Sequence, residues 1–238
     1  MRILYPGHGG RDPGAVYQGR QEKDDALALA MAVGEILENA GIDVLYTRTE
    51  DVYDTPYEKA VIGNNSGADY FLSIHRNATA APGGASGIET LVYQKGGEAE
   101  RLAENINQGL AGVGFKDRGI TERPNLVVLR RTQMPAVLVE AGFIDSQADN
   151  ERFDRDFEQI AQAIADGFLK TVGVTVDSQE KEELRPLYQV QVGAYRFRQF
   201  ADEMLMELQA EGFPAWIEAG DGYYRVKVGA FEQLDNAV

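Results

Sequence analysis

The two histidines of this 238-residue chain each follow a short apolar run. His8 comes after the run RILY and a Pro-Gly pair, and His75 comes directly after YFLSI. A third apolar run, residues 136–139, is followed by Glu140. Runs of this length with β-branched and aromatic residues are typical of buried strands. If these strands are parallel neighbours, their carboxyl ends share one edge of the sheet, where open α/β sheets bind ligands. The three residues are therefore expected to converge on one site.

Two imidazoles and one carboxylate are a ligand set for catalytic zinc, which leaves a fourth position for water. Zinc held in this way lowers the pKa of its water towards about 7 and polarises a carbonyl, as amide hydrolysis requires. A second carboxylate, off the metal, would move the proton. Glu22 is the other candidate, although an acid in the first turn of a helix commonly just complements the helix dipole. The sequence has no HExxH motif, and a core or loop-structuring role of the histidines stays open.

Helices and strands alternate through the first 173 residues, which predicts an α/β fold. The glycines at 7, 9, 10 and 14 predict an irregular loop around His8. The further predicted elements are a helix over 22–40, a strand over 42–46, a helix and a turn ahead of the strand that carries His75, a strand over 87–93, a helix over 98–110, strands over 125–129 and 136–139, and a helix over 153–172.

The last quarter of the chain differs from the rest. Residues 174–185 are highly charged and predict a linker. Beyond it, VQVGAY at 190–195 recurs as VKVGAF at 226–231, which predicts a duplicated βαβ-like unit.

Composition excludes several classes of function. The net charge is −15 and no basic stripe is present, which argues against nucleic-acid binding and against anionic membranes. No apolar run approaches the roughly 18 residues that span a bilayer. Cysteine is absent, so neither a disulfide nor a thiolate can contribute. The oligomeric state is left open.

Three segments together carry a family resemblance. PGHGGRDPGA at 6–15, FLSIHRNA at 71–78 and MPAVLVEAGFIDSQAD at 134–149 resemble the zinc-dependent N-acetylmuramoyl-L-alanine amidases, the amidase-3 family, over residues 1–173. The resemblance implies a mixed, mostly parallel sheet flanked by helices. It also implies that His8, Glu22 and His75 bind Zn²⁺ and that Glu140 is the catalytic acid/base. The substrate would be peptidoglycan, cut at the amide between N-acetylmuramic acid and L-alanine.

Two residues, one directly before the first segment and one within the second, raise separate questions. Tyr5 stands where the family more often has an acidic residue, so the group that orients His8 is unassigned. Arg76 follows His75, and a guanidinium pairs well with carboxylates. Our hypothesis is that Arg76 binds a carboxylate of the stem peptide, and the alternative is a solvent-exposed loop arginine.

Residues 186–238 resemble a SPOR domain, a small α+β fold with βαββαβ topology, of which most of the second helix and the fourth strand would be missing. The resemblance implies binding to glycan strands stripped of their peptides. Gln191, Tyr195 and Arg225 match positions that could take part, although Tyr195 can equally cap the core. The predicted organisation is an amidase domain over 1–173, a linker over 174–185 and a SPOR-like domain over 186–238.

The combination predicts a lytic wall amidase, either a phage endolysin or an autolysin. Met1 runs directly into the first strand without a signal-peptide pattern. We therefore expect synthesis in the cytoplasm and action on the wall after lysis or holin-type release. The alternatives are a non-catalytic wall-binding or regulatory protein that retains zinc, and a zinc peptidase that acts elsewhere on the stem peptide.

Overall fold

The structure, a computed structural model, describes residues 2–80, 83–174, 188–196, 198–211, 213, 215–220 and 223–231. The chain divides into two compact units, Met1–Val176 and Asp177–Val238. The predicted linker falls almost entirely outside the described residues. Among the described residues, no helix is both long enough and apolar enough to cross a membrane.

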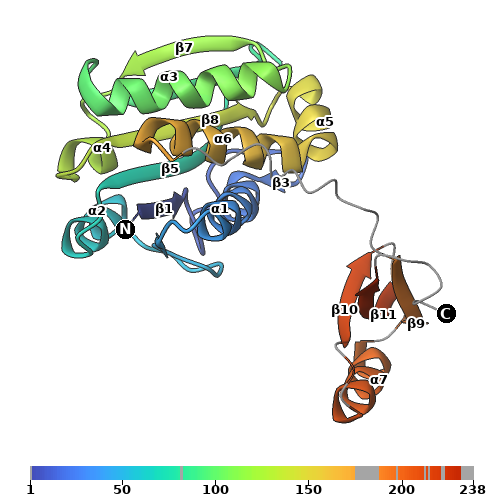
Figure 1. The fold of residues 1–238 in the computed structure, drawn as a ribbon. Coiled ribbons are helices and arrows are strands. Elements are labelled where there is room, and N and C mark those ends of the chain that lie inside the picture. Colours follow the sequence, from blue (N-terminus) through green and yellow to red (C-terminus); the bar gives the residue numbers. More distant parts are fainter. Residues whose placement is uncertain are drawn as a thin grey trace. The chain divides into compact units, whose positions relative to one another are not determined.

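A six-stranded sheet forms the centre of the first unit, with the order β4-β1-β5-β8-β6-β7 (Figure 1). β1, β4, β5 and β8 run parallel, β6 is antiparallel to β8, and β7 is parallel to β6. The predicted mixed, mostly parallel sheet is thereby confirmed. The strands are β1 (Arg2–Pro6), β4 (Val44–Tyr46), β5 (Tyr70–Asn77), β6 (Ile88–Val92), β7 (Asp117–Glu122) and β8 (Ala136–Phe143), and a separate hairpin joins β2 (Val16–Tyr17) to β3 (Arg20–Gln21).

Helices cover both faces of this sheet. The larger core, which includes Leu29, Leu102 and Ile160, packs α1, α3 and α6 against one face. A smaller cluster, which includes Tyr5 and Val128, packs against the other face. The helices are α1 (Glu22–Asn39), α2 (Pro56–Asn65), α3 (Gly97–Gly112), α4 (Val127–Arg131), α5 (Gln147–Arg155) and α6 (Phe157–Val172).

Side chains alternate between the two faces of the sheet along β5 and β8, and this alternation decides which residues lie on the face of the candidate site. Leu72 and Ile74 of β5 belong to the larger core, whereas Phe71 belongs to the smaller one. Successive side chains of a strand point to opposite faces, so His75 lies on the face of Phe71, at the carboxyl end of β5. Glu140 pairs with His75 in the register between β5 and β8, and its side chain shares that face.

Several elements of the structure differ from the predicted ones. Residues 125–129 were predicted as a strand, but Val127–Arg131 forms the helix α4, since a short apolar run does not distinguish a buried strand from a buried helix. The strand β7 was missed because this half-exposed edge strand has no apolar alternation. The helix predicted over 153–172 is divided at Asp156, where α5 ends and α6 begins.

The second unit contains β9 (Tyr188–Tyr195), α7 (Arg198–Ala210), β10 (Ala215–Gly220) and β11 (Tyr223–Phe231). The three strands form an antiparallel sheet with the order β10-β11-β9. The two copies of the internal repeat lie in the paired strands β9 and β11. Residues 232–238 lie outside the described residues.

Candidate metal centre and active site

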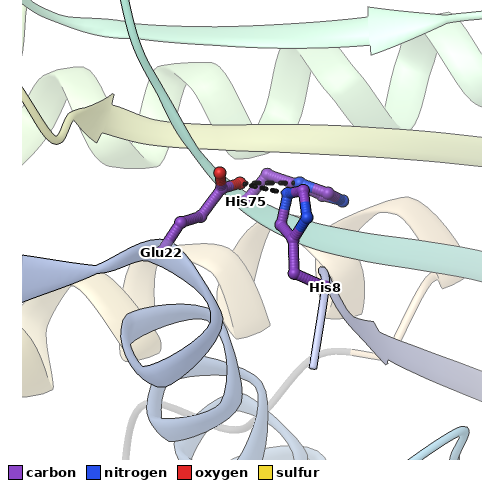
Figure 2. Close-up of side chains that lie close together, drawn as sticks. All are labelled: His8, Glu22 and His75. Atoms are coloured by element: carbon purple, nitrogen blue, oxygen red, sulfur yellow. Dashed lines mark hydrogen bonds and ion pairs between the residues drawn. The ribbon is translucent and has the colours of Figure 1, made fainter. Parts of the chain in front are cut away.

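Three side chains from separate elements meet at the carboxyl ends of β1 and β5. His8 lies in the loop after β1, Glu22 opens α1, and His75 belongs to β5 (Figure 2). Glu22 Oε1 is 3.1 Å from Nε2 of His8 and 2.8 Å from Nδ1 of His75. One possible ligand atom from each residue lies within 4.8 Å of the others, and no other such group occurs among the described residues. Two imidazole nitrogens and a carboxylate oxygen facing one point fit the ligand set of zinc.

Glu22 is held in place by the loop that precedes α1. Its Oε2 accepts a hydrogen bond of 2.8 Å from the backbone nitrogen of Ala15, and its own backbone nitrogen donates to the carbonyl of Ala15 at 2.9 Å. Burial by itself would raise the pKa of Glu22, but hydrogen bonds and charge interactions with His75 and His8 outweigh it and lower the pKa. The carboxylate is therefore ionised, as a metal ligand must be.

Two loop glycines leave space for the ligands. A Cβ atom on Gly14 would lie 2.6 Å from Glu22 Oε2 and 2.6 Å from Cδ2 of His8. A Cβ atom on Gly7 would overlap the ring of His75. The glycines of the motif therefore permit close packing around the three ligands.

Asp12 is the group that orients the imidazole of His8. Its Oδ2 is 2.9 Å from Nδ1 of His8, and its Oδ1 accepts a hydrogen bond from the backbone nitrogen of Gly14 at 3.1 Å. A carboxylate at Nδ1 holds the proton there and leaves Nε2 free to bind a metal. Sequence reasoning missed Asp12, although it lies only four residues after His8 in the same motif. Tyr5 instead packs edge-on against the ring of His75, with centroids 5.8 Å apart.

Asp12→Asn is expected to weaken zinc binding about 10–100-fold, because an amide holds the tautomer of His8 less firmly. Competition with a chromophoric chelator measures the affinity. Asp51→Asn is the matched control, since Asp51 accepts a hydrogen bond from Gly10 at 2.7 Å without contacting a ligand. Equal losses in both variants would show that Asp12 merely orders the loop.

Glu140 lies beside this centre as a carboxyl group that the three ligands do not use. In the sheet register it pairs with His75 on one side and with Glu89 of β6 on the other. Its buried Oε2 has no hydrogen-bond partner among the described residues. Burial, together with the charges of Glu22 and Glu89, raises the pKa of Glu140 to about 8. A carboxyl group that takes and releases a proton near neutral pH suits general acid/base catalysis.

The raised pKa predicts a pH dependence of stability in the metal-free protein. Between pH 4.5 and about 8 the folded state keeps the Glu140 proton that the unfolded state releases, so this residue's contribution to stability falls as the pH rises. Glu140→Gln cannot lose that proton. Its unfolding temperature relative to the wild type is expected to increase from pH 4.5 to pH 8, measured with chelator present. A constant difference across this window would contradict the assignment.

Arg76 does not occupy the position predicted from the sequence. Its side chain is 2% exposed, with Nη1 at 2.5 Å from Asp25 and Nη2 at 2.7 Å from Asn150. Strand alternation turns Arg76 away from the face that carries His75, and its guanidinium lies 4.1 Å from the centroid of Phe153. Arg76 therefore links β5 to α1 and α5 through hydrogen bonds. A buried side chain with these partners is neither the proposed contact to the stem peptide nor a solvent-exposed loop arginine.

An apolar cavity of about 280 Å³ adjoins the two histidines. It extends the site across the face of the sheet that α2 and α4 partly cover. Apart from the two histidines, its apolar lining consists of Tyr5, Pro56, Leu126, Val127, Val128 and Leu138, and its polar lining of Asp12, Asp54, Lys59 and Asn125.

The three candidate glycan contacts of the second unit divide between two faces. Gln191 pairs with Lys227, and Arg225 lies two residues from Lys227 on the same strand, so both lie on one face. Tyr195 pairs with Tyr224 and lies on the face of the buried Val226. This placement favours the core-capping alternative for Tyr195.

Comparisons with known proteins show the family and the fold. Residues 3–170 match the model of the N-acetylmuramoyl-L-alanine amidase family, and residues 185–238 match the SPOR domain. A sporulation-specific N-acetylmuramoyl-L-alanine amidase of Bacillus subtilis is 36% identical over 90% of this chain and 83% of its own length. An endolysin of Bacillus phage SPP1 is 36% identical over 72% of this chain and 65% of its own length.

Solved structures show the same relationship. The N-acetylmuramoyl-L-alanine amidase of Clostridium difficile 630 superposes with a TM-score of 0.69 at 34% identity, over 72% of this chain and 96% of that one. The catalytic domain of CwlV, an amidase from Bacillus (Paenibacillus) polymyxa, gives 0.68 at 32% identity, over 73% of this chain and 98% of that one. The chain thus belongs to the N-acetylmuramoyl-L-alanine amidase family, with a SPOR domain after its amidase domain.

Proposed function

We propose that this chain hydrolyses the amide between N-acetylmuramic acid and L-alanine in peptidoglycan, with Zn²⁺ held by His8, Glu22 and His75. The observation that carries the proposal is the convergence of these three side chains within 4.8 Å. When bound, zinc supplies an acidified water and polarises the scissile carbonyl.

Glu140 performs the proton transfers in this proposal. It takes a proton from the attacking water and delivers it to the nitrogen of the departing L-alanine. Its position beside His75, with Oε2 lacking a partner among the described residues, leaves it available for both steps. Asp12 holds the proton on Nδ1 of His8, and Ala15 holds the second oxygen of Glu22.

The ligand set favours this proposal over a zinc-retaining, non-catalytic wall-binding protein. Structural zinc sites are closed by four protein ligands, whereas catalytic sites have three. Among the described residues, the metal-ligand group contains three. The adjacent protonatable Glu140 and the apolar cavity add what catalysis and substrate binding require.

Digestion of purified peptidoglycan tests the proposal. The expected products carry new N-terminal L-alanine, and EDTA abolishes their release. Termini from other bonds of the stem would instead identify a zinc peptidase. Wall binding without any new terminus would identify the non-catalytic alternative.

For the SPOR domain we propose binding to peptide-stripped glycan, in which Gln191 and Arg225 take part from one face of the sheet. The amidase reaction produces such glycan, so catalysis and tethering would act on one polymer. Co-sedimentation of the full chain with intact and with peptide-stripped peptidoglycan tests this, and equal retention on both would contradict it.

We further propose a lytic role as an endolysin or autolysin that is made in the cytoplasm and reaches the wall after lysis or holin-type release. The similarity to the SPP1 endolysin and to the sporulation-specific amidase supports this role. Activity in the medium of cells that remain unlysed would contradict it.

A further inference from the structure

His8 has an unusual backbone conformation. Its φ is 58°, and the only other non-glycine residue with positive φ among the described residues is Gln18, in the turn between β2 and β3. Residues with a Cβ atom seldom adopt this left-handed region. Such a conformation persists where its surroundings hold it in place. The contacts around the His8 peptide therefore determine whether its imidazole faces Glu22 and His75.

Two buried cations hold consecutive carbonyls of this loop. Arg48 Nη2 donates to the carbonyl of Gly7 at 2.8 Å and to that of Lys23 at 2.8 Å. Lys59 Nζ donates to the carbonyl of His8 at 2.8 Å. Arg48 is 3% exposed and Lys59 is 0% exposed. The peptide that follows His8 is thus fixed by a side chain from α2, 51 residues away in the sequence.

Lys59 reaches this position without a carboxylate partner. Among the described residues it forms no ion pair, and its Nζ lies 4.3 Å from the centroid of the Tyr5 ring. Burial, reinforced by the charge of Arg48, lowers the pKa of Lys59 to about 8. A buried cation is costly unless neighbouring groups compensate it. The carbonyl of His8 and the face of the Tyr5 ring contact the ammonium group directly, and the charges of Asp54 and Asp12 favour it without forming an ion pair.

The helix that carries Lys59 is itself well anchored. α2 begins with a capping box in which Thr55 and Glu58 each bind the backbone nitrogen of the other, at 2.7 and 3.2 Å. Lys59 follows directly after Glu58. A fixed helix therefore delivers the ammonium group to the His8 loop.

We propose that Lys59 is a positioning residue for the metal ligand His8, which it holds through the His8 carbonyl, and that the face of the Tyr5 ring stabilises its ammonium group. This inference rests on the proposed function, because it assigns His8 to the metal. With a neutral ring at position 5, the carboxylates nearest the two histidine rings are those of Glu22 and Asp12.

Two matched pairs of variants test the inference. Lys59→Met removes the donor at similar length, whereas Lys59→Arg keeps a cation that can donate. Tyr5→Leu removes the aromatic face, whereas Tyr5→Phe keeps it. Zinc affinity is measured by competition with a chromophoric chelator, and the metal-free proteins are compared by thermal unfolding.

Lys59→Met is expected to bind zinc about 10–100-fold more weakly, the range for groups that orient metal ligands. Lys59→Arg is expected to restore most of the affinity. The zinc affinity of Tyr5→Phe should match that of the wild type. The zinc affinity of Tyr5→Leu should lie between those of the wild type and Lys59→Met.

Wild-type zinc affinity in folded Lys59→Met would overturn the inference. If Lys59→Met does not fold, the Tyr5 pair decides, and equal affinities of Tyr5→Leu and Tyr5→Phe would overturn it. A wild-type chain that binds no zinc would overturn both the inference and the proposed function. Zinc-dependent release of L-alanine with unchanged affinity in the variants would overturn the inference alone.

Discussion

Glu140→Gln is expected to lower the rate of L-alanine release from peptidoglycan about 10²–10⁴-fold, the usual contribution of a general acid/base. Glutamine has nearly the same shape as glutamate but cannot accept and return a proton. Zinc binding should remain, because Glu140 is not among the three clustered ligands. The two measurements are the rate of appearance of N-terminal L-alanine and the zinc content of the purified variant.

Glu89→Gln provides the matched control for this result. Glu89 pairs with Glu140 across the sheet, and its carboxylate accepts hydrogen bonds from Thr121 and Asn77. Glu89→Gln therefore changes the local charge without removing the proposed proton carrier. It is expected to lower the rate of L-alanine release less than Glu140→Gln does. If both variants lose the same activity, or if Glu140→Gln loses its zinc, Glu140 is not the acid/base.

Glu22→Gln should weaken zinc binding by more than the roughly 10–100-fold that outer-shell partners contribute, because it alters a ligand itself. A neutral amide oxygen is a poorer donor to zinc than a carboxylate. Hydrolysis is expected to fall with the affinity and to recover in part when zinc is added in excess. Chelator competition and peptidoglycan digestion at increasing zinc concentration measure the two effects.

Asp24→Asn is the control that separates the loss of zinc binding in Glu22→Gln from a change in the interaction with the helix dipole. Asp24 is an exposed acid in the same first turn of α1. Loss of either charge should reduce the favourable dipole interaction by about 0.3–1 kcal/mol. Only Glu22→Gln should change zinc affinity, and a similar loss in Asp24→Asn would mean that Glu22 acts through the helix rather than on the metal.

Much of the architecture could be predicted from local patterns. The runs that lead to His8, His75 and Glu140 are short, strongly apolar and form β1, β5 and β8. Strands of this kind are recognisable alone, and parallel neighbours place their carboxyl ends at one edge. The position of the candidate site therefore followed from the order of the elements, together with the family resemblance that singled out Glu22.

Other elements could not be predicted from the sequence, because they are defined by contacts with distant parts of the chain. The run at 125–129 has the composition of a strand, yet α4 packs its apolar side chains over the sheet. The edge strand β7 pairs only with β6 and carries polar residues, so pairing rather than apolar alternation defines it.

The sequence by itself determined where His8, His75 and Glu140 lie, because each follows a recognisable apolar strand, and the family resemblance added Glu22 as the third proposed ligand. Only the tertiary structure decided how they are held. Asp12 orients His8, Lys59 fixes its carbonyl across 51 residues, and Arg76 turns inward to Asp25. These pairings depend on distances between separate elements and on which side of a strand a residue faces, and both arise only when the chain has folded.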